Sequence, residues 1–244
     1  DDECKYGYLV PANMFAVVAL RYVAELAPVL WSEKGGTDLG RRALKLASEI
    51  DSGIKKHGIV NHEVHGPIYA YEVDGLGNYL LMDDANVPSL LSIPYLGYDF
   101  DPEVYANTRR FILSKHNPTY QKGKNRITGE IEGYGSPHMA KAVWKNIWPM
   151  AIAMQGLTST DPEEKARLAE KLVKATGGTG WMHESFDVND PKHFTRSWFC
   201  WADALFAELV MSITDECPPR HQKYKIMSWR DPNDVKGGGY SEEI

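Results

Sequence analysis

Apolar and polar residues follow a helical period over most of this chain. Apolar positions recur three and four residues apart, which predicts helices at 13–27, 38–57, 83–97, 101–114, 145–158, 161–176 and 194–212. The helices at 101–114 and 161–176 each begin with Asp-Pro, a common helix start. Strongly apolar helices, such as 194–212, alternate with amphipathic ones, such as 161–176. Inner helices buried on several sides and covered by outer helices produce this alternation, so the sequence predicts an all-α fold, an (α/α) toroid or barrel.

Two other segments depart from the helical pattern. Residues 68–73 are rich in β-branched and aromatic side chains, and Gly75 and Gly77 follow them, which predicts a short β-hairpin. Residues 217–244 are polar and rich in proline and glycine. We therefore expect one helical domain over 1–216 and a peripheral tail over 217–244.

The composition argues against several classes of function. The chain has 244 residues, a net charge of −6 and 43% hydrophobic residues, which is typical of a soluble globular protein. Lys and Arg form no cluster, which argues against a nucleic-acid partner. Apolar runs stay below the roughly 18 residues of a membrane span. Cys4, Cys200 and Cys217 lack metal-ligand spacing, and no N-glycosylation sequon is present; both facts favour a reducing compartment, although the compartment is not determined.

The unusual acidic residues fall in the predicted loops. They occur at the amino terminus, in the hairpin, before the third helix and before the last helix; they are Asp1, Asp2, Glu72, Asp74, Asp83, Asp84, Glu184, Asp187 and Asp190. Loops before inner helices of a toroid open on one end, where we expect these acids to meet aromatic residues: Tyr6, Tyr8, Tyr69, Tyr71, Trp181 and Trp198. Carboxylates between aromatic rings suit a sugar site, and two opposed carboxyl groups can hydrolyse a glycoside.

Simpler interpretations account for several polar motifs. Asp101 and Asp161 are helix caps, and for Asp83 and Asp84 capping competes with a place in the cavity. The HEVH motif at 62–65 has histidines three apart and is not the HExxH arrangement, so no metal is expected. GYGSPH at 133–138 lacks the lysine of a phosphate loop, and Ser185 lacks a nucleophile elbow.

Five long motifs carry a specific resemblance. They are YGYLVPANMFAVV, YEVDGLGNYLLMDDANVPSLLSIPYLGY, GYGSPH, IWPMAIAMQGLTS and GWMHESFDVNDPKHFTRSWFCWADALFAELV. Together the motifs resemble glycoside hydrolase family 125, metal-independent exo-α-mannosidases, and its fungal members in particular. The resemblance implies an (α/α)6 barrel, no cofactor, and an inverting mechanism. Its general acid lies before the sixth helix and its general base before the twelfth.

The resemblance also implies roles for individual residues. The base falls on Glu184, and the acid falls on Asp1 or Asp2, the pair before the Cys-x-Tyr-Gly-Tyr-Leu motif; which of the two is left open. The remaining positions are substrate-binding candidates: Asp83, Asp84, Asn86 and His138 toward mannose hydroxyls, Trp181 and His183 around the base, and Glu72 and Arg196 in support. For Arg196, a buried ion pair without sugar contact is the alternative.

The same resemblance makes this chain the carboxyl-terminal part of a barrel, supplying about the last seven helices. The chain opens with neither Met nor a targeting pattern, so we expect the amino-terminal half of the barrel as a physical partner. The expected substrate is an α-mannoside oligosaccharide, with α-1,6 linkage favoured. Two rival functions are another carbohydrate-active enzyme on the same architecture and a non-catalytic glycan-binding or scaffold protein.

Overall fold

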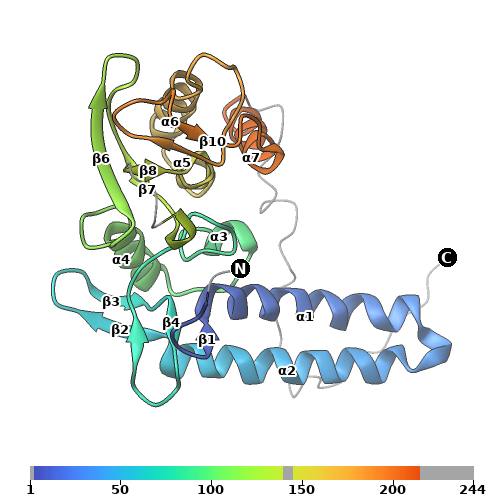
Figure 1. Cartoon of the computed structure of the whole chain (residues 1–244). Coiled ribbons are helices and arrows are strands. Elements are labelled where there is room, and N and C mark those ends of the chain that lie inside the picture. Colours follow the sequence, from blue (N-terminus) through green and yellow to red (C-terminus); the bar gives the residue numbers. More distant parts are fainter. Residues whose placement is uncertain (1–2, 140–144, 215–244) are drawn as a thin grey trace.

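Helices dominate the computed structural model, which describes residues 3–139 and 145–214 (Figure 1). The helices are α1 Val10–Leu30, α2 Gly36–His57, α3 Ile93–Leu96, α4 Pro102–Ile112, α5 Pro149–Leu157, α6 Pro162–Lys174 and α7 Cys200–Met211, with short 3-10 turns η1 Ser32–Lys34 and η2 Pro137–Met139. The strands are β1 Tyr8–Leu9, β2 Ile59–His62, β3 Gly66–Tyr69, β4 Glu72–Val73, β5 Tyr79–Leu80, β6 Tyr120–Asn125, β7 Gly129–Tyr134, β8 Asn146–Ile147, β9 Ser185–Asp187 and β10 Phe194–Thr195. The predicted tail over 217–244 lies outside the described residues.

Helices α1 and α2 form a long antiparallel pair that projects from the rest of the molecule (Figure 1). The two backbones approach closely at Gly40, where an added Cβ would lie 2.9 Å from the carbonyl oxygen of Ala24. Both helices were predicted, although Pro28 lies inside the last turn of α1 instead of beyond it. Among the described helices, α1 alone is long and apolar enough to cross a membrane, with 22% of the tested window buried. This corrects the expectation that no apolar segment reaches that length, although a core helix can meet the same criteria.

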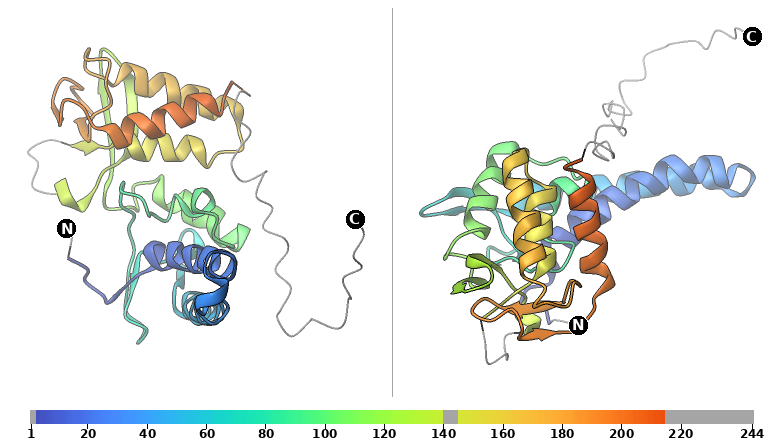
Figure 2. Two further views of the ribbon diagram at one scale, coloured as in Figure 1. Left: turned by 90° about the vertical axis from the view of Figure 1, so that its right-hand side faces the viewer. Right: turned by 90° about the horizontal axis from the view of Figure 1, so that it is seen from above.

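Helices α5, α6 and α7 pack side by side, as Figure 2 shows, and they reproduce the predicted alternation in part. Nearly all of α5 is buried, because α6 and α7 both cover it. Helix α6 buries Leu168 and Leu172 and leaves its charged face in solvent. The expectation for α7 was wrong: only Ala202, Leu205 and Leu209 are buried, so an apolar surface of this helix is exposed.

The predicted caps of α4 and α6 are confirmed. The Asp101 carboxylate accepts hydrogen bonds from the backbone N–H groups of Glu103 and Val104. Asp161 accepts one from the N–H of Glu163. These carboxylates satisfy N–H groups that have no partner inside the helix.

The predicted helix at 83–97 is wrong over most of its length, since only Ile93–Leu96 is helical. The carboxylate of Asp83 accepts hydrogen bonds from the N–H groups of Leu90 and Leu91, which closes residues 83–91 into a loop. The Val87–Pro88 peptide bond in this loop is cis. A hydrogen bond across seven residues gives no periodic signal, so the apolar spacing alone was misleading.

Strands are more numerous than the sequence predicted. The expected hairpin exists as β4–β5, although residues 68 and 69 belong to β3 and pair with β2. Asp74 accepts hydrogen bonds from the N–H groups of Leu76 and Asn78 in the turn. Three further groups were missed: the β2–β3 hairpin, the β6–β7 hairpin, and the sheet in the order β10-β9-β8. Strands β8 and β10 occupy the beginnings of the predicted helices 145–158 and 194–212, so α5 and α7 start later. Two sheets, β1-β4-β5 and β10-β9-β8, position the site described next.

Candidate functional site

A cavity of about 460 Å³ is lined by residues from both ends of the described chain. Its acidic residues are Glu3, Glu72, Asp84 and Glu184, and its basic residues are Lys5, His138 and Arg196. Its aromatic residues are Tyr71, Trp148 and Trp201. Carboxylates, cations and rings therefore surround a space large enough for a small ligand.

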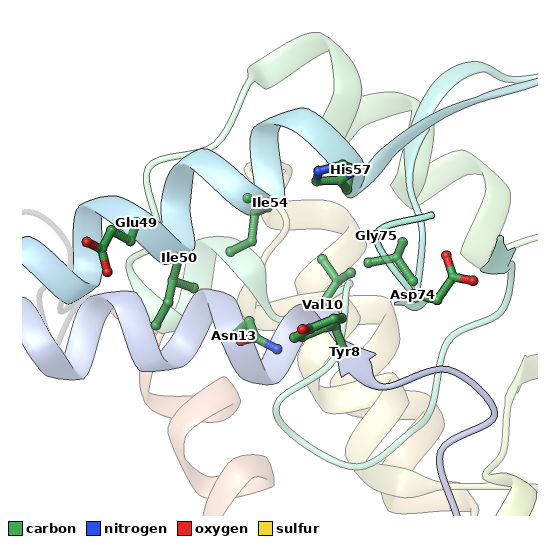
Figure 3. Close-up of a pocket in the computed structure, with 11 residues that line it drawn as sticks. Tyr8, Val10, Asn13, Glu49, Ile50, Ile54, His57, Asp74 and Gly75 are labelled. Atoms are coloured by element: carbon green, nitrogen blue, oxygen red, sulfur yellow. The ribbon is translucent and has the colours of Figure 1, made fainter. Parts of the chain in front are cut away.

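A second hollow, of about 510 Å³, lies between α1, α2 and the β4–β5 turn (Figure 3). Apolar residues such as Val10, Ile50 and Ile54 form much of its wall. Its carboxylates are Glu49 and Asp74, and both oxygens of Asp74 already accept hydrogen bonds within the turn. Acid–base chemistry therefore points to the first cavity, although the second is slightly larger.

Glu184 lies in the wall of the first cavity, directly before β9, and its side chain is 9% exposed. Its backbone N–H donates to the carbonyl oxygen of Thr195, which continues the β9–β10 pairing of Ser185 with Thr195. The Nε atom of Arg196 lies 3.0 Å from Oε1 of Glu184. The arginine side chain is 60% exposed, so the pair is buried on the glutamate side alone.

The backbone of Arg196 has an unusual conformation. Its φ is +51°, and among residues 3–139 and 145–214 no other non-glycine residue has a positive φ. This conformation costs about 1–2 kcal/mol for a residue with a Cβ, whereas a solvent-exposed ion pair contributes about 0–1 kcal/mol. The strain therefore has to be held by the surroundings.

His183 supplies part of that support. It is 1% exposed, and its ring stacks on Phe194 with the centroids 3.7 Å apart. Its Nδ1 lies 3.0 Å from the carbonyl oxygen of Arg196, and its Nε2 lies 3.0 Å from that of Thr176. Both ring nitrogens contact protein atoms, and His183 does not line the cavity.

Glu72 connects the cavity to the amino-terminal segment. Its Oε2 accepts a 2.8 Å hydrogen bond from the N–H of Tyr6, and it pairs with Leu9 in the β1–β4 ladder. Residues Glu3 to Lys5, which directly follow Asp1 and Asp2, line the same cavity as Glu184. Asp1 and Asp2 themselves lie outside the described residues.

Asp83 and Asp84 are neighbours with different roles. Asp83 is fully buried, and its carboxylate also accepts a hydrogen bond from the hydroxyl group of Tyr134. Burial raises its pKa to about 7, and the two backbone donors at Leu90 and Leu91 oppose this shift. Asp84 lines the cavity and accepts hydrogen bonds from the backbone and side-chain N–H groups of Asn86. Asp83 therefore holds the loop that presents Asp84 and Asn86.

The remaining sequence candidates lie in different places. His138 lines the cavity, whereas Trp181 does not and is 54% exposed. Tyr71 lines it, as the sequence predicted; Trp148 and Trp201 line it as well, and sequence reasoning had not assigned them to the site. The signal for Trp201 was hidden because the last helix was predicted to begin at Phe194; with the observed start at Cys200, Trp201 lies in the first turn.

The histidines of the HEVH motif form a cluster away from this cavity. Nε2 of His65 lies 2.8 Å from Nδ1 of His116, and His62 packs against both rings. Burial, followed by the neighbouring charges of His62, His116 and Arg110, lowers the pKa of His65. In the part of the chain that the structure describes, no group of three or more His, Cys, Asp or Glu side chains could hold a metal ion.

A cavity that combines carboxylates with aromatic rings has the groups that a carbohydrate-active protein needs, since carboxylates can bind sugar hydroxyls and hydrolyse a glycoside. The family model of the metal-independent α-mannosidases, glycoside hydrolase family 125, matches residues 1–211. The chain belongs to this family.

Relatives agree with this assignment. The chain is 47% identical over 220 residues to the meiotically up-regulated gene 157 protein of Schizosaccharomyces pombe (strain 972 / ATCC 24843), covering 89% of this chain and 41% of that protein. A solved Streptococcus pneumoniae structure, from a study of metal-independent α-mannosidases, is a non-productive complex with α-1,6-mannobiose. It is 47% identical, with a TM-score of 0.81, over 88% of this chain and 49% of that one. The chain thus spans less than half of each of these two relatives.

A more distant structure shares the fold. A bacterial glucoamylase complexed with acarbose superimposes with a TM-score of 0.62 at 16% identity, over 86% of this chain and 34% of the glucoamylase. At this identity the similarity concerns the fold alone.

Proposed function

We propose that this chain carries both catalytic carboxyl groups of an exo-α-mannosidase that removes terminal α-1,6-linked mannose with inversion. One observation carries the proposal: Glu184 and the residues next to Asp1 and Asp2 line one cavity, although they are far apart in sequence. The family assignment and the α-1,6-mannobiose in the bacterial relative support the substrate.

In this proposal Glu184 is the general base and Asp1 or Asp2 is the general acid. Glu184 removes a proton from a water molecule that attacks the anomeric carbon, and the aspartic acid protonates the leaving glycosidic oxygen. Inversion requires the two carboxyl groups to stand about 6.5–9.5 Å apart, which leaves room for the water. Single-step displacement by water turns the α-mannoside into β-mannose.

Polar groups around the cavity bind the sugar in this proposal. Asp84, Asn86 and His138 line the cavity, as do Glu72 and Arg196 from other segments. Carboxylate, amide and imidazole groups supply both acceptors and donors for mannose hydroxyls. Trp201 adds an aromatic face against which a pyranose can stack.

We further propose that the described helices belong to an (α/α)6 barrel completed by an amino-terminal half. Helix α1 leaves large apolar side chains in solvent, among them Phe15, Leu26 and Val29. Apolar surface of this extent is uncommon on an isolated monomer. The two relatives have more than half of their length outside the matched region, which is enough chain to cover these helices.

The test uses the full-length protein and α-1,6-mannobiose in the presence of EDTA. Proton NMR at early times is expected to show β-mannose as the first product. Glu184→Gln should lower kcat by about 10²–10⁴-fold, because general-base catalysis contributes that much. Glu132→Gln, an exposed residue of the β6–β7 hairpin, is the matched control and should retain activity.

Three outcomes would contradict parts of the proposal. α-Mannose as the first product excludes inversion. Full activity of Glu184→Gln excludes this residue as the base. Binding of mannobiose without release of mannose would favour the glycan-binding alternative.

A further inference from the structure

Arg196 combines a strained backbone with an ion pair to the proposed base. Its left-handed conformation is unique among the non-glycine residues that the structure describes. Glycine adopts this conformation without strain, whereas arginine does not. A strained residue next to a cavity carboxylate points to a role for its side chain.

The surroundings hold this conformation from two sides. Before Arg196, the β9–β10 ladder ends with Thr195 paired to Ser185. After it, the N–H of Phe199 donates to the carbonyl oxygen of Met182. Between these points, Nδ1 of His183 lies 3.0 Å from the carbonyl oxygen of Arg196, within hydrogen-bonding distance. The residues on either side of the base, Met182 to Ser185, therefore determine where Arg196 lies.

The side chain of Arg196 contacts one oxygen of the proposed base, Glu184. Nε of Arg196 lies 3.0 Å from Oε1 of Glu184, and its guanidinium lies over the ring of Phe199, 5.3 Å from the centroid. This closest contact is made with Oε1 of a carboxylate that lines the cavity. The guanidinium group thus acts on Oε1, and Oε2 is the candidate oxygen for binding water.

We propose that Arg196 is a positioning residue that fixes Oε1 of Glu184 so that Oε2 faces the attacking water, with His183 holding the backbone of Arg196 in place. This role rests on the proposed function, in which Glu184 is the base. It also explains why His183 makes no contact with the cavity: its ring supports the arginine instead of the sugar.

An ion pair that serves only stability would behave differently. Arg109 and Glu164 form such a pair away from the cavity, with both side chains about one-fifth exposed and an N–O distance of 3.1 Å. Loss of that pair should lower the melting temperature and leave kcat per folded molecule unchanged. Arg109→Ala is therefore the matched control for Arg196.

The test compares Arg196→Gly, Arg196→Lys and Arg109→Ala in the full-length protein. Arg196→Gly removes the side chain while glycine accepts the same φ, so this variant should fold. Its kcat should fall about 100-fold with KM within about threefold, because positioning acts on the chemical step. Guanidinium at millimolar concentrations should raise kcat of Arg196→Gly by at least about tenfold. The kcat of Arg196→Lys should lie between those of wild type and Arg196→Gly.

Several results would overturn the positioning role. They are a kcat of Arg196→Gly within about threefold of wild type, a loss confined to KM, or no recovery with guanidinium. A crystal structure of Arg196→Gly gives a readout that does not depend on turnover: Glu184 should leave its position, and an unmoved Glu184 overturns the role. Wild-type protein that releases no mannose instead refutes the proposed function, and the crystal structure still decides the positioning.

Discussion

The backbone N–H of Tyr6 donates a 2.8 Å hydrogen bond to Oε2 of Glu72, 66 positions later in the chain. Glu72 also pairs with Leu9 in the β1–β4 ladder. The side chain of Glu72 therefore contacts Tyr6 while its backbone contacts Leu9, three residues further along the amino-terminal segment. Together they hold the amino-terminal segment against the sheet at the edge of the cavity. Glu72 is only 4% exposed, so water has little access to compete for this hydrogen bond.

Glu72→Ala should loosen the amino-terminal segment. A hydrogen bond to a charged group contributes about 1.5–3 kcal/mol, so hydrogen exchange of the Tyr6 amide should accelerate about tenfold to a hundredfold. Turnover of mannobiose should fall as well, because the proposed acid lies next to this segment.

Glu72→Gln is the matched variant for this anchor. It keeps an oxygen acceptor, so its Tyr6 amide exchange should lie between wild type and Glu72→Ala, as measured by mass spectrometry. Equal exchange in all three proteins would show that the hydrogen bond does not anchor the segment.

Asp83 should make stability depend on pH. Burial raises its pKa to about 7 in the folded chain, compared with an ordinary value of 3.8. Between these two values the folded state binds a proton that the unfolded state has released, so the contribution of this group to stability is lost as pH rises from about 4 to about 7.

The measurement for Asp83 is urea unfolding at several pH values between 4 and 8. Asp83→Asn cannot titrate, so the stability of wild type relative to this variant should fall by up to about 4 kcal/mol across that range. Parallel stability curves for the two proteins would contradict a raised pKa at Asp83.

Trp201 and Trp181 should differ in their effect on substrate binding. Trp201 lines the cavity and is 41% exposed, whereas Trp181 is 54% exposed and lies outside the lining. Trp201→Ala should lower kcat/KM by about tenfold to a hundredfold, a loss of about 1.4–2.7 kcal/mol.

Trp181→Ala is the control, because it makes the same substitution outside the cavity lining. Its kcat/KM should change by less than about threefold. Steady-state kinetics on mannobiose measures both. A larger effect at Trp181 would place the sugar outside the cavity that Trp201 lines.

Gly177 should be the least replaceable glycine in the loop before the base. Its φ is +62°, and an added Cβ would lie 2.5 Å from the carbonyl oxygen of Pro191. Gly177→Ala combines backbone strain with a clash against main chain, so it should destabilise the protein by about 1–3 kcal/mol.

Gly178 separates these two effects. Its φ is +90°, and a Cβ added there would have no neighbour within 4 Å, so Gly178→Ala should show the strain without the clash. Thermal unfolding of both variants measures the difference, and equal melting temperatures would exclude the contact with Pro191 as a constraint.

The local signals in the sequence predicted local structure well. Helix α2 and the caps of α4 and α6 were anticipated, because apolar spacing and an aspartate before a proline act within a few residues. The helix over 83–97 failed because the Asp83 carboxylate binds backbone groups seven and eight residues away. Strands β8 and β10 were missed because both pair with β9, which lies about 40 residues from β8 and outside the helical period of β10.

The sequence likewise predicted some residues of the candidate site and not others. Long motifs led to the family and to Glu184, whose place in the cavity wall the structure describes. Motif reading grouped His183 with the sugar-binding residues, but it could not reveal that the ring binds the carbonyl oxygen of Arg196. It also could not select Trp201 from the many aromatic residues around it, because the direction of a side chain depends on where the helix begins.

The sequence by itself determined that the chain is mostly helical, which family it belongs to, and which carboxylates merit attention. These properties depend on residue identity and short spacing. Only the tertiary structure decided that Tyr6 contacts Glu72, that Asp83 is buried while Asp84 lines the cavity, and that Arg196 takes a strained conformation beside Glu184. Burial and long-range hydrogen bonds depend on which distant segments pack together, and no local pattern encodes that packing.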